Sequence, residues 1–309
     1  MHGVVITAYR DFPQLASLLR ALPDARVHVH LDRNAAFTQA QRRFLESLAH
    51  VVVASTYRVS WGGISHLRAI IDGVESLTQE PAIETIHILS GQDYPCRPLS
   101  TYSDIRDPQR AYLSLTAVTD QPVLLRRFRT RFEFPDQDLR DPAVRAGDAL
   151  SIERQERSGN VRTTLGSMQR LYKGMVWGSL PADMARYCVK VARTDRAFMD
   201  DLVHSRIPEE FFFQTVLMNS PLAPRVSPNA TTFMLWTPGR AVNSGPAVLN
   251  IGDLDQILAS DKVFVRKVDS TDSAELVAAL ADRIGASPWS PPVERRFALW
   301  RFDAGRARR

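Results

Sequence analysis

Short β-rich runs alternate with helical spacing through the first third of the chain, and this order most constrains the fold. Apolar and β-branched residues concentrate in four runs that predict strands, over 4–8, 27–31, 51–54 and 85–89. Leucine and isoleucine spacing predicts helices between these runs, over 12–22, 39–48 and 64–77. Strand–helix–strand order with short connections indicates a mostly parallel sheet flanked by helices. The predicted fold class is therefore α/β.

Polar residues follow several of these predicted strands, where open α/β sheets bind their ligands. They are Tyr9-Arg10, Asp32-Arg33 and Ser90-Gly91-Gln92-Asp93. A carboxylate at Asp32 can accept hydrogen bonds from a nucleoside base or ribose. Taken alone, Asp32 could equally be a turn residue or a helix N-cap. The loop at 90–95 could be a shaped binding loop or an ordinary turn.

A Trp-Gly-Gly sequence, Trp61-Gly62-Gly63, lies between a predicted strand and a predicted helix. Two glycines let a backbone turn tightly or approach a ligand closely. The Trp61 ring could stack on a uracil or a sugar, or it could be a buried anchor within a loop.

Two adjacent carboxylates, Glu209 and Glu210, open an apolar helical segment that contains three consecutive phenylalanines. Carboxylates in a first helical turn complement the helix dipole, which is a sufficient explanation for one of them. A carboxylate beside aromatic side chains is also placed to have a raised pKa. A general base that deprotonates a hydroxyl requires such tuning.

The segment from about 110 to 170 is rich in Arg, Asp and Pro, and its helical periodicity is poor, which predicts an irregular stretch. Long irregular stretches in a compact domain are usually functional or disordered. Its arginines, Arg126, Arg127, Arg129 and Arg131, would suit an acidic or phosphorylated glycan, or they could form a solvated loop. Further along, apolar spacing predicts helices over 183–191, 195–204, 211–217 and 271–284, and strands over 231–235 and 263–268.

The 309-residue chain carries a net charge of +5. A basic surface suits phosphate-bearing ligands, anionic polysaccharide, nucleic acid or a membrane, or it serves solubility alone. No recognition-helix, RNP-like or zinc motif supports a nucleic-acid partner. The two cysteines, Cys96 and Cys188, cannot build a disulfide framework and lack metal-site spacing, so we expect reduced thiols.

The chain shows neither a signal-peptide pattern at its start nor a run of about 18 apolar residues, which predicts a cytoplasmic protein. Residues 287–292 have the composition of a linker. Residues 294–309 mix arginines with aromatic residues and predict a basic amphipathic tail. This tail could contact an anionic membrane peripherally at its inner face, pack on its own domain, or fray as a terminus.

In their order along the chain, these motifs resemble the core-2/I-branching β-1,6-N-acetylglucosaminyltransferase and xylosyltransferase family, glycosyltransferase family 14. The resemblance runs from about Val4 to Asp269. It is carried by His30 with Asp32, Trp61-Gly62-Gly63 with Ser65, Ser90-Gly91 with Asp93-Tyr94-Pro95, Tyr172-Lys173-Gly174 with Trp177 and Leu180, Pro208-Glu209-Glu210-Phe211-Phe212 with Thr215, Gly252-Asp253-Leu254, and Val263–Asp269.

The resemblance implies a GT-A fold in a single catalytic domain over 1–286, followed by the linker and tail over 287–309. A Rossmann-like nucleotide-binding half would cover about 1–110, and an acceptor half about 111–286. It also implies residue roles. Asp32 would contact uridine, Trp61 would lie against the nucleotide, and Lys267 would bind the diphosphate. Arg240 or Arg266 could supply the second cation for the diphosphate.

The resemblance further implies that Glu210 is the catalytic base, with Glu209 at the preceding acidic position. Residues expected at the donor or acceptor are Ser90, Gly91, Asp93, Tyr94, Gly174, Trp177, Arg131 and Glu209. The implied reaction is an inverting transfer of a sugar, first of all N-acetylglucosamine, from a UDP-sugar to a hydroxyl of a glycan or lipid-linked oligosaccharide. UDP-xylose and UDP-glucuronic acid remain open as donors.

Family members work without a cofactor or metal, so the resemblance implies that basic side chains replace a metal at the diphosphate. Two Asp-x-Asp sequences, at 136–138 and 253–255, are interpreted as surface-loop or helix-cap residues. The chain lacks the membrane anchor, stem and many cysteines of animal members, which suggests a bacterial-type enzyme. The alternative is a non-catalytic relative that binds a glycan or nucleotide.

Overall fold

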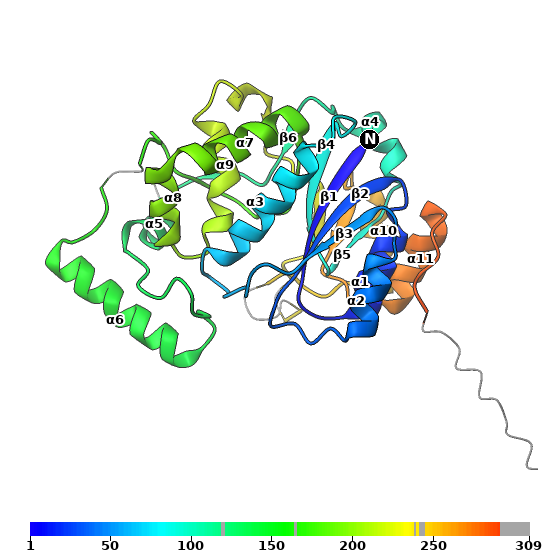
Figure 1. Ribbon diagram of the computed structural model, residues 1–309, viewed down its shortest axis with the longest axis horizontal. Coiled ribbons are helices and arrows are strands. Elements are labelled where there is room, and N and C mark those ends of the chain that lie inside the picture. The colour runs from blue at the N-terminus through cyan, green and yellow to red at the C-terminus, as the bar shows by residue number, and fades with distance from the viewer. Residues whose placement is uncertain (119–120, 164–165, 238, 241–244, 291–309) are drawn as a thin grey trace, which may run out of the picture.

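The computed structural model describes residues 1–118, 121–163, 166–237, 239–240 and 245–290. A seven-stranded sheet runs through its centre, with strand order β10-β6-β9-β4-β1-β2-β3 (Figure 1). Its strands are β1 (His2–Ala8), β2 (Ala25–Leu31), β3 (Val51–Ala54), β4 (Thr85–Ser90), β6 (Ala111–Tyr112), β9 (Gly178–Pro181) and β10 (Val226–Ser227). Neighbouring strands are parallel except at β9, which is antiparallel to β4 and β6. The predicted α/β fold class with a mostly parallel sheet is confirmed.

Alternation along β1 shows why the sheet is covered on both faces. Val4 and Ile6 belong to one apolar core, and Val5 between them belongs to the other. Successive side chains of a strand point to opposite faces, so a strand buried on both sides reads as one continuous apolar run. The first core packs α1 (Phe12–Arg20) and α11 (Ala274–Ile284) on the sheet, and the second packs α3 (Ser65–Thr78) and α7 (Ala182–Thr194) (Figure 1).

A smaller three-stranded sheet joins segments that are far apart in the sequence. It contains β11 (Thr232–Met234), β12 (Phe264–Arg266) and β5 (Asp93–Pro95), in that order. Strand β12 runs antiparallel to β5, and the register places Arg266 opposite Asp93. The pairing therefore brings the loop after β4 against the late Phe-containing strand.

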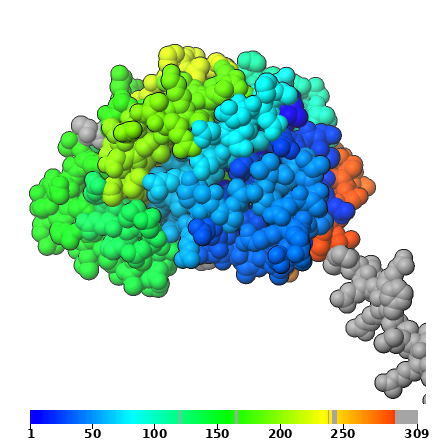
Figure 2. Space-filling view, in the orientation of Figure 1, coloured from blue at the N-terminus to red at the C-terminus, as the bar shows by residue number. Residues whose placement is uncertain are grey.

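The remaining elements lie mostly in the second half of the chain. They are α2 (Gln39–Glu46), α4 (Tyr102–Ile105), β7 (Thr116–Ala117), α5 (Pro122–Arg129), α6 (Pro142–Ser158), β8 (Tyr172–Lys173), α8 (Arg196–Val203), α9 (Phe212–Met218), α10 (Leu254–Ala259), and the 3₁₀ turns Leu99–Thr101, Pro208–Glu210, Ala223–Arg225 and Ile251–Asp253. Figure 2 shows the segment at 121–163 in green, at the end of the molecule away from the blue first strands and helices.

The prediction of an irregular stretch over 110–170 is wrong for α5 and for the 17-residue α6. Helix α6 begins after Asp141, whose side chain accepts hydrogen bonds from the backbone N–H groups of Ala143 and Val144, and it ends at Gly159 with φ 68°. Its buried positions are Val144, Asp148, Ser151 and Gln155, at helical spacing. Because three of the four are polar, apolar periodicity could not reveal the helix.

The start of the predicted linker packs on the domain. The centroid of the Trp289 ring lies 5.2 Å from that of the Phe12 ring. The backbone N–H of Trp289 donates to Ser17 Oγ at 3.0 Å. The predicted amphipathic tail at 294–309 lies outside the described residues. Within the described ranges, no helix is both long and apolar enough to cross a membrane.

Candidate active site

Asp32 lies directly beyond β2, at the carboxyl edge of the sheet. Its backbone N–H donates to the carbonyl of Ala8 at the end of β1, at 2.9 Å. Its Oδ1 accepts from the N–H groups of Asn34 at 2.9 Å and Val59 at 3.1 Å. One carboxylate oxygen therefore shapes the turn, as the simpler interpretation predicted. The uridine contact stays a prediction for Oδ2, which no described residue bonds.

The Trp-Gly-Gly turn connects the two halves of the domain. A Cβ on Gly63 would lie 2.1 Å from the carbonyl oxygen of Pro135, so only glycine fits there. The neighbouring Gly62 has φ 90° and accepts a hydrogen bond from the Ile207 N–H at 2.8 Å. Trp61 is 41% exposed, so the alternative of a buried anchor is wrong, and the Arg140 guanidinium carbon lies 6.0 Å from the centroid of its ring.

Four residues from three motifs meet at Arg266. Arg266 Nη1 lies 3.3 Å from both carboxylate oxygens of Asp93 and also donates to Ser90 Oγ. Its guanidinium carbon lies 4.2 Å from the centroid of the Trp177 ring. Asp93 is fully buried, and that burial raises its pKa while the Arg266 charge and the Ser90 hydrogen bonds oppose the shift. The network fixes Arg266 in place.

Tyr94 is also fully buried, in the core shared with α1. Gly91 lies within van der Waals reach of Ala8, where a Cβ would approach the Ala8 Cβ at 3.1 Å. The buried side chains of Asp93 and Tyr94 therefore cannot touch a ligand directly. They can affect a ligand only through the residues that they contact. The ligand roles predicted for the 90–94 loop stay predictions.

Lys267 follows Arg266 at the end of β12 and forms no ion pair with any described residue. Burial, together with the positive charges of Arg266 and Arg10 and against the charge of Asp93, lowers its pKa to about 8. Arg266 directly precedes Lys267 in the chain, and Arg10 lies among the residues after β1. Sequence reasoning noted Arg10 beyond its strand but gave it no role. Concentrated positive charge of this kind suits a diphosphate.

Arg240, the other candidate for the second cation, is engaged elsewhere. Both of its Nη atoms donate to the carboxylate of Asp253, each at 2.8 Å. Asp253 also accepts from the N–H of Asn250 at 2.9 Å, which caps the following turn. The helix-cap interpretation of Asp253 is therefore confirmed. Both arginines are therefore paired with a carboxylate, Arg266 with Asp93 and Arg240 with Asp253, but Arg266 is the one that adjoins Lys267 in the chain.

Glu210 lies on the 3₁₀ turn that precedes α9, and its carboxylate meets two cations. Its Oε2 lies 2.9 Å from Arg127 Nη1 and 3.2 Å from Lys173 Nζ. The three following phenylalanines are fully buried in the core beneath it. The expected apolar surroundings of this carboxylate are therefore wrong, because the aromatic rings face inward and the carboxylate faces charged side chains.

The Tyr-Lys-Gly motif supports this position through its backbone. The Gly174 N–H donates to the Glu210 carbonyl at 2.9 Å. A Cβ on Gly174 would lie 1.8 Å from the carbonyl oxygen of Ser114, so no other residue fits there. Gly174 thus brings Lys173 to Glu210, which explains why two motifs 37 residues apart act at one place.

Glu209 points the other way, into the nucleotide-binding half. Its Oε1 accepts from His66 Nδ1 at 3.0 Å, and His66 Nε2 lies 3.1 Å from Thr7 Oγ1 at the end of β1. Its Oε2 is buried and has no hydrogen-bond partner among the described residues. The geometry therefore separates the two neighbouring glutamates. Sequence reasoning missed His66, whose only signal was its place just after the Trp-Gly-Gly turn.

Replacing His66 should reveal how strongly it holds Glu209. We expect His66→Ala to destabilise the fold by about 1–3 kcal/mol, since a buried carboxylate oxygen loses its donor. His66→Asn keeps a donor near the position of Nδ1 and should recover part of that loss. Urea unfolding of both variants measures the difference. Equal stability of His66→Ala and the unaltered protein would show that the contact contributes nothing.

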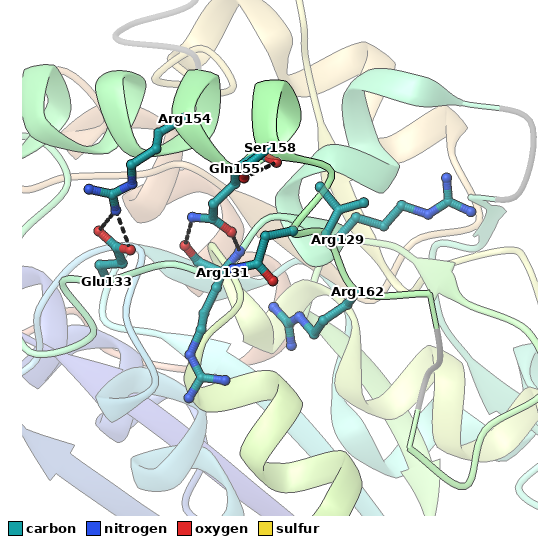
Figure 3. A pocket seen from close by; sticks show the side chains of 9 residues that line it. Arg129, Arg131, Glu133, Arg154, Gln155, Ser158 and Arg162 are labelled. Atoms are coloured by element: carbon teal, nitrogen blue, oxygen red, sulfur yellow. Dashed lines mark hydrogen bonds and ion pairs between the residues drawn. The ribbon is translucent and has the colours of Figure 1, made fainter.

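Arg131 lies apart from these groups, on a cavity formed by residues 129–162. The cavity has a volume of about 450 Å³, and four of its nine lining residues are arginines (Figure 3). The structure therefore separates the predicted site residues into three places: the cations at the ends of β1 and β12, the Glu210 group, and the cavity beside Arg131.

The fold defines the class of the protein, an α/β protein built on a mostly parallel sheet. More particularly, the chain belongs to the core-2/I-branching enzyme family, whose model matches residues 4–258. The predicted family is thus confirmed. No curated protein sequence matches the chain significantly.

Similar solved structures include residues 1–349 of S. aureus TarS, with 13% identity and a TM-score of 0.36, over 74% of this chain and 57% of that one. The same TarS fragment in complex with UDP has 13% identity and a TM-score of 0.40, over 93% and 68%. An active-site mutant of LgtC has 9% identity and a TM-score of 0.42, over 93% and 98%. The chain spans little more than half of the first of these.

Proposed function

We propose that this protein transfers a sugar from a UDP-sugar to a hydroxyl group of a glycan acceptor. Membership of the branching-enzyme family supports this proposal. The observation that carries it is the Glu210 carboxylate, which is held by Arg127 and Lys173 on the acceptor half and lies only 16% exposed. A fixed, partly shielded carboxylate is suited to general-base work.

In the proposed reaction the sugar is transferred with inversion, in one displacement at the anomeric carbon. Glu210 accepts the proton of the acceptor hydroxyl as its oxygen forms the new glycosidic bond. The bond from the sugar to UDP breaks on the opposite face, and the electron pair leaves with the diphosphate. Lys267, with Arg10 and Arg266 nearby, offsets the negative charge that grows on this leaving group.

Asp32 and Trp61 are the proposed contacts of the nucleoside. Asp32 Oδ2 would accept a hydrogen bond from the base or the ribose. The exposed indole of Trp61 would stack on the base. N-acetylglucosamine is the first donor sugar that we propose, because of the resemblance to N-acetylglucosaminyltransferases. The acceptor would be a glycan or a lipid-linked oligosaccharide.

Titration calorimetry with UDP and a panel of UDP-sugars tests this function directly. We expect UDP to bind and one UDP-sugar to bind more tightly than the others. UDP binding without turnover on any acceptor would favour the non-catalytic relative. A protein that binds neither UDP nor any UDP-sugar would overturn the proposal.

Removing divalent metal should leave activity largely intact. Among the described residues, no three His, Cys, Asp or Glu side chains group in a way that could hold a metal ion. In the two Asp-x-Asp sequences, Asp138 pairs with Arg140, and Asp253 pairs with Arg240. We therefore expect the same turnover with and without EDTA. Strict dependence on manganese would show that one of these pairs opens to bind a metal.

A further inference from the structure

The proposed reaction does not account for the arginine-lined cavity beside Arg131. Helix α5, helix α6 and the segment after α6 enclose it (Figure 3). It is lined by Arg129, Arg131, Glu133, Arg154, Gln155, Ser158, Asn160, Val161 and Arg162. Four cations and one carboxylate therefore share a volume of about 450 Å³.

Two of the four guanidiniums already have partners. Arg154 Nη2 donates to both carboxylate oxygens of Glu133, at 2.6 and 2.7 Å. Arg162 donates to the carbonyl of His204 at 2.6 Å and to Asp201 Oδ1 at 3.2 Å. Arg129 and Arg131 are exposed and form no side-chain hydrogen bond or ion pair with a described residue. Two positive charges in the cavity therefore lack a counter-charge within the described part of the chain.

Hydrogen bonds to the backbone hold the segment that carries these two arginines. Thr130 and Phe132, which alternate with them, are buried. Arg129 is the last residue of α5 and Thr130 has extended backbone angles, and the arginines on either side of Thr130 are both exposed. The buried Gln155 side chain accepts from the Arg131 N–H at 2.6 Å and donates to the Arg131 carbonyl at 2.8 Å. The Arg162 N–H donates to the Arg129 carbonyl at 2.8 Å.

The positive charges also influence one another. Burial lowers the pKa of Arg162, and the charges of Arg131 and Arg206 lower it further, although Asp201 opposes them. An anion within the cavity would offset this repulsion. Guanidinium groups bind phosphate and carboxylate through paired, charge-assisted hydrogen bonds.

The cavity is connected to the proposed base through α5. Arg127, near the end of that helix, contacts Glu210, and its carbonyl accepts from the Arg206 N–H at 3.0 Å. Arg206 in turn pairs with Asp148 of α6, at 2.5 and 2.7 Å. Helix α5 therefore borders the cavity and also carries a residue that contacts Glu210, while Arg206 ties α5 to α6.

We propose that this cavity binds a negatively charged group, a phosphate or a carboxylate, carried by the acceptor glycan. Arg129 and Arg131 contact this negatively charged group, and Arg162 adds its positive charge from within the same cavity. The assignment of the charged group to the acceptor rests on the proposed glycosyl transfer. The anion site itself does not, because it follows from the unpaired arginines.

The test is titration of the full chain, saturated with UDP, with glucose 6-phosphate, glucuronate and glucose. Saturation with UDP keeps a sugar phosphate out of the proposed diphosphate site. We expect at least one charged sugar to bind and glucose to bind far more weakly. Comparison of glucose 6-phosphate with glucuronate distinguishes phosphate from carboxylate. Arg129→Gln with Arg131→Gln should weaken the charged sugar about tenfold or more, which corresponds to about 1.4 kcal/mol.

Arg157→Gln is the matched control, because Arg157 lies on α6 and is 82% exposed, but does not line the cavity. It removes one positive charge, against two in the double variant, and should leave binding unchanged. Equal weakening in Arg157→Gln, or unchanged binding in the double variant, would overturn the proposal. So would equal binding of glucose and the charged sugars. UDP binding, measured first on the same sample, tests the proposed function separately.

Discussion

Glu210→Gln is expected to lower turnover by roughly 10²-fold or more, as the loss of a general base does. The amide keeps the shape of the side chain but cannot accept the acceptor proton. UDP should bind with unchanged affinity, since Glu210 lies on the acceptor half with Arg127 and Lys173. Turnover with saturating UDP-sugar and calorimetry with UDP measure the two quantities.

Glu209→Gln is the matched comparison, because it makes the same change at the neighbouring position. Glu209 faces His66 rather than the two cations, so turnover should fall much less. If Glu210→Gln is fully active while Glu209→Gln is not, then the base is Glu209 and the assignment is reversed. Full activity of both single variants would place the base outside the turn that carries the two glutamates.

Lys267→Ala is expected to weaken UDP binding by about ten- to a hundredfold. A hydrogen bond to a charged group contributes about 1.5–3 kcal/mol, and the half-buried Lys267 forms no ion pair with a described residue. Lys262→Ala is the control, since Lys262 is bonded to the carbonyl of Ala230 at 2.8 Å. Unchanged UDP affinity in Lys267→Ala would remove Lys267 from the diphosphate site.

UDP affinity should also depend on pH through the same lysine. The pKa of Lys267 is lowered to about 8, mainly by burial, so the side chain is charged below that pH and neutral above it. The charged form attracts the diphosphate. Affinity should therefore fall as pH rises from 7 to 9, and this fall should be smaller in Lys267→Ala. Equal pH dependence in both proteins would assign the titration to another group.

The first third of the fold could be predicted because its strands read as short apolar or β-branched runs, of which β1 and β4 are buried almost throughout. Strand β3, over Val51–Ala54, was predicted with the bounds that the structure shows. Helix α6 could not be predicted in this way, because its buried stripe contains Asp148, Ser151 and Gln155. The burial of these polar groups depends on partners elsewhere, such as Arg206 for Asp148.

The candidate site divides in a similar manner. The order of the motifs along the chain indicated which residues belong to the candidate site, but not which of those residues contact one another. The contact of Arg266 with Asp93 spans 173 positions, and that of His66 with Glu209 spans 143. Such contacts depend on the register of β12 against β5 and on the packing of α3. The spacing of residues within a single motif carries no information about that register or that packing.

The Trp-Gly-Gly turn has a consequence for protein engineering. A Cβ at Gly63 would collide with the Pro135 carbonyl, and the Leu139 N–H donates to the Trp61 carbonyl at 2.9 Å. The loop at 135–139 is therefore fitted to this one turn. A chimera that exchanged the acceptor half for that of a relative, in order to change acceptor choice, would need to transplant the turn and the loop together.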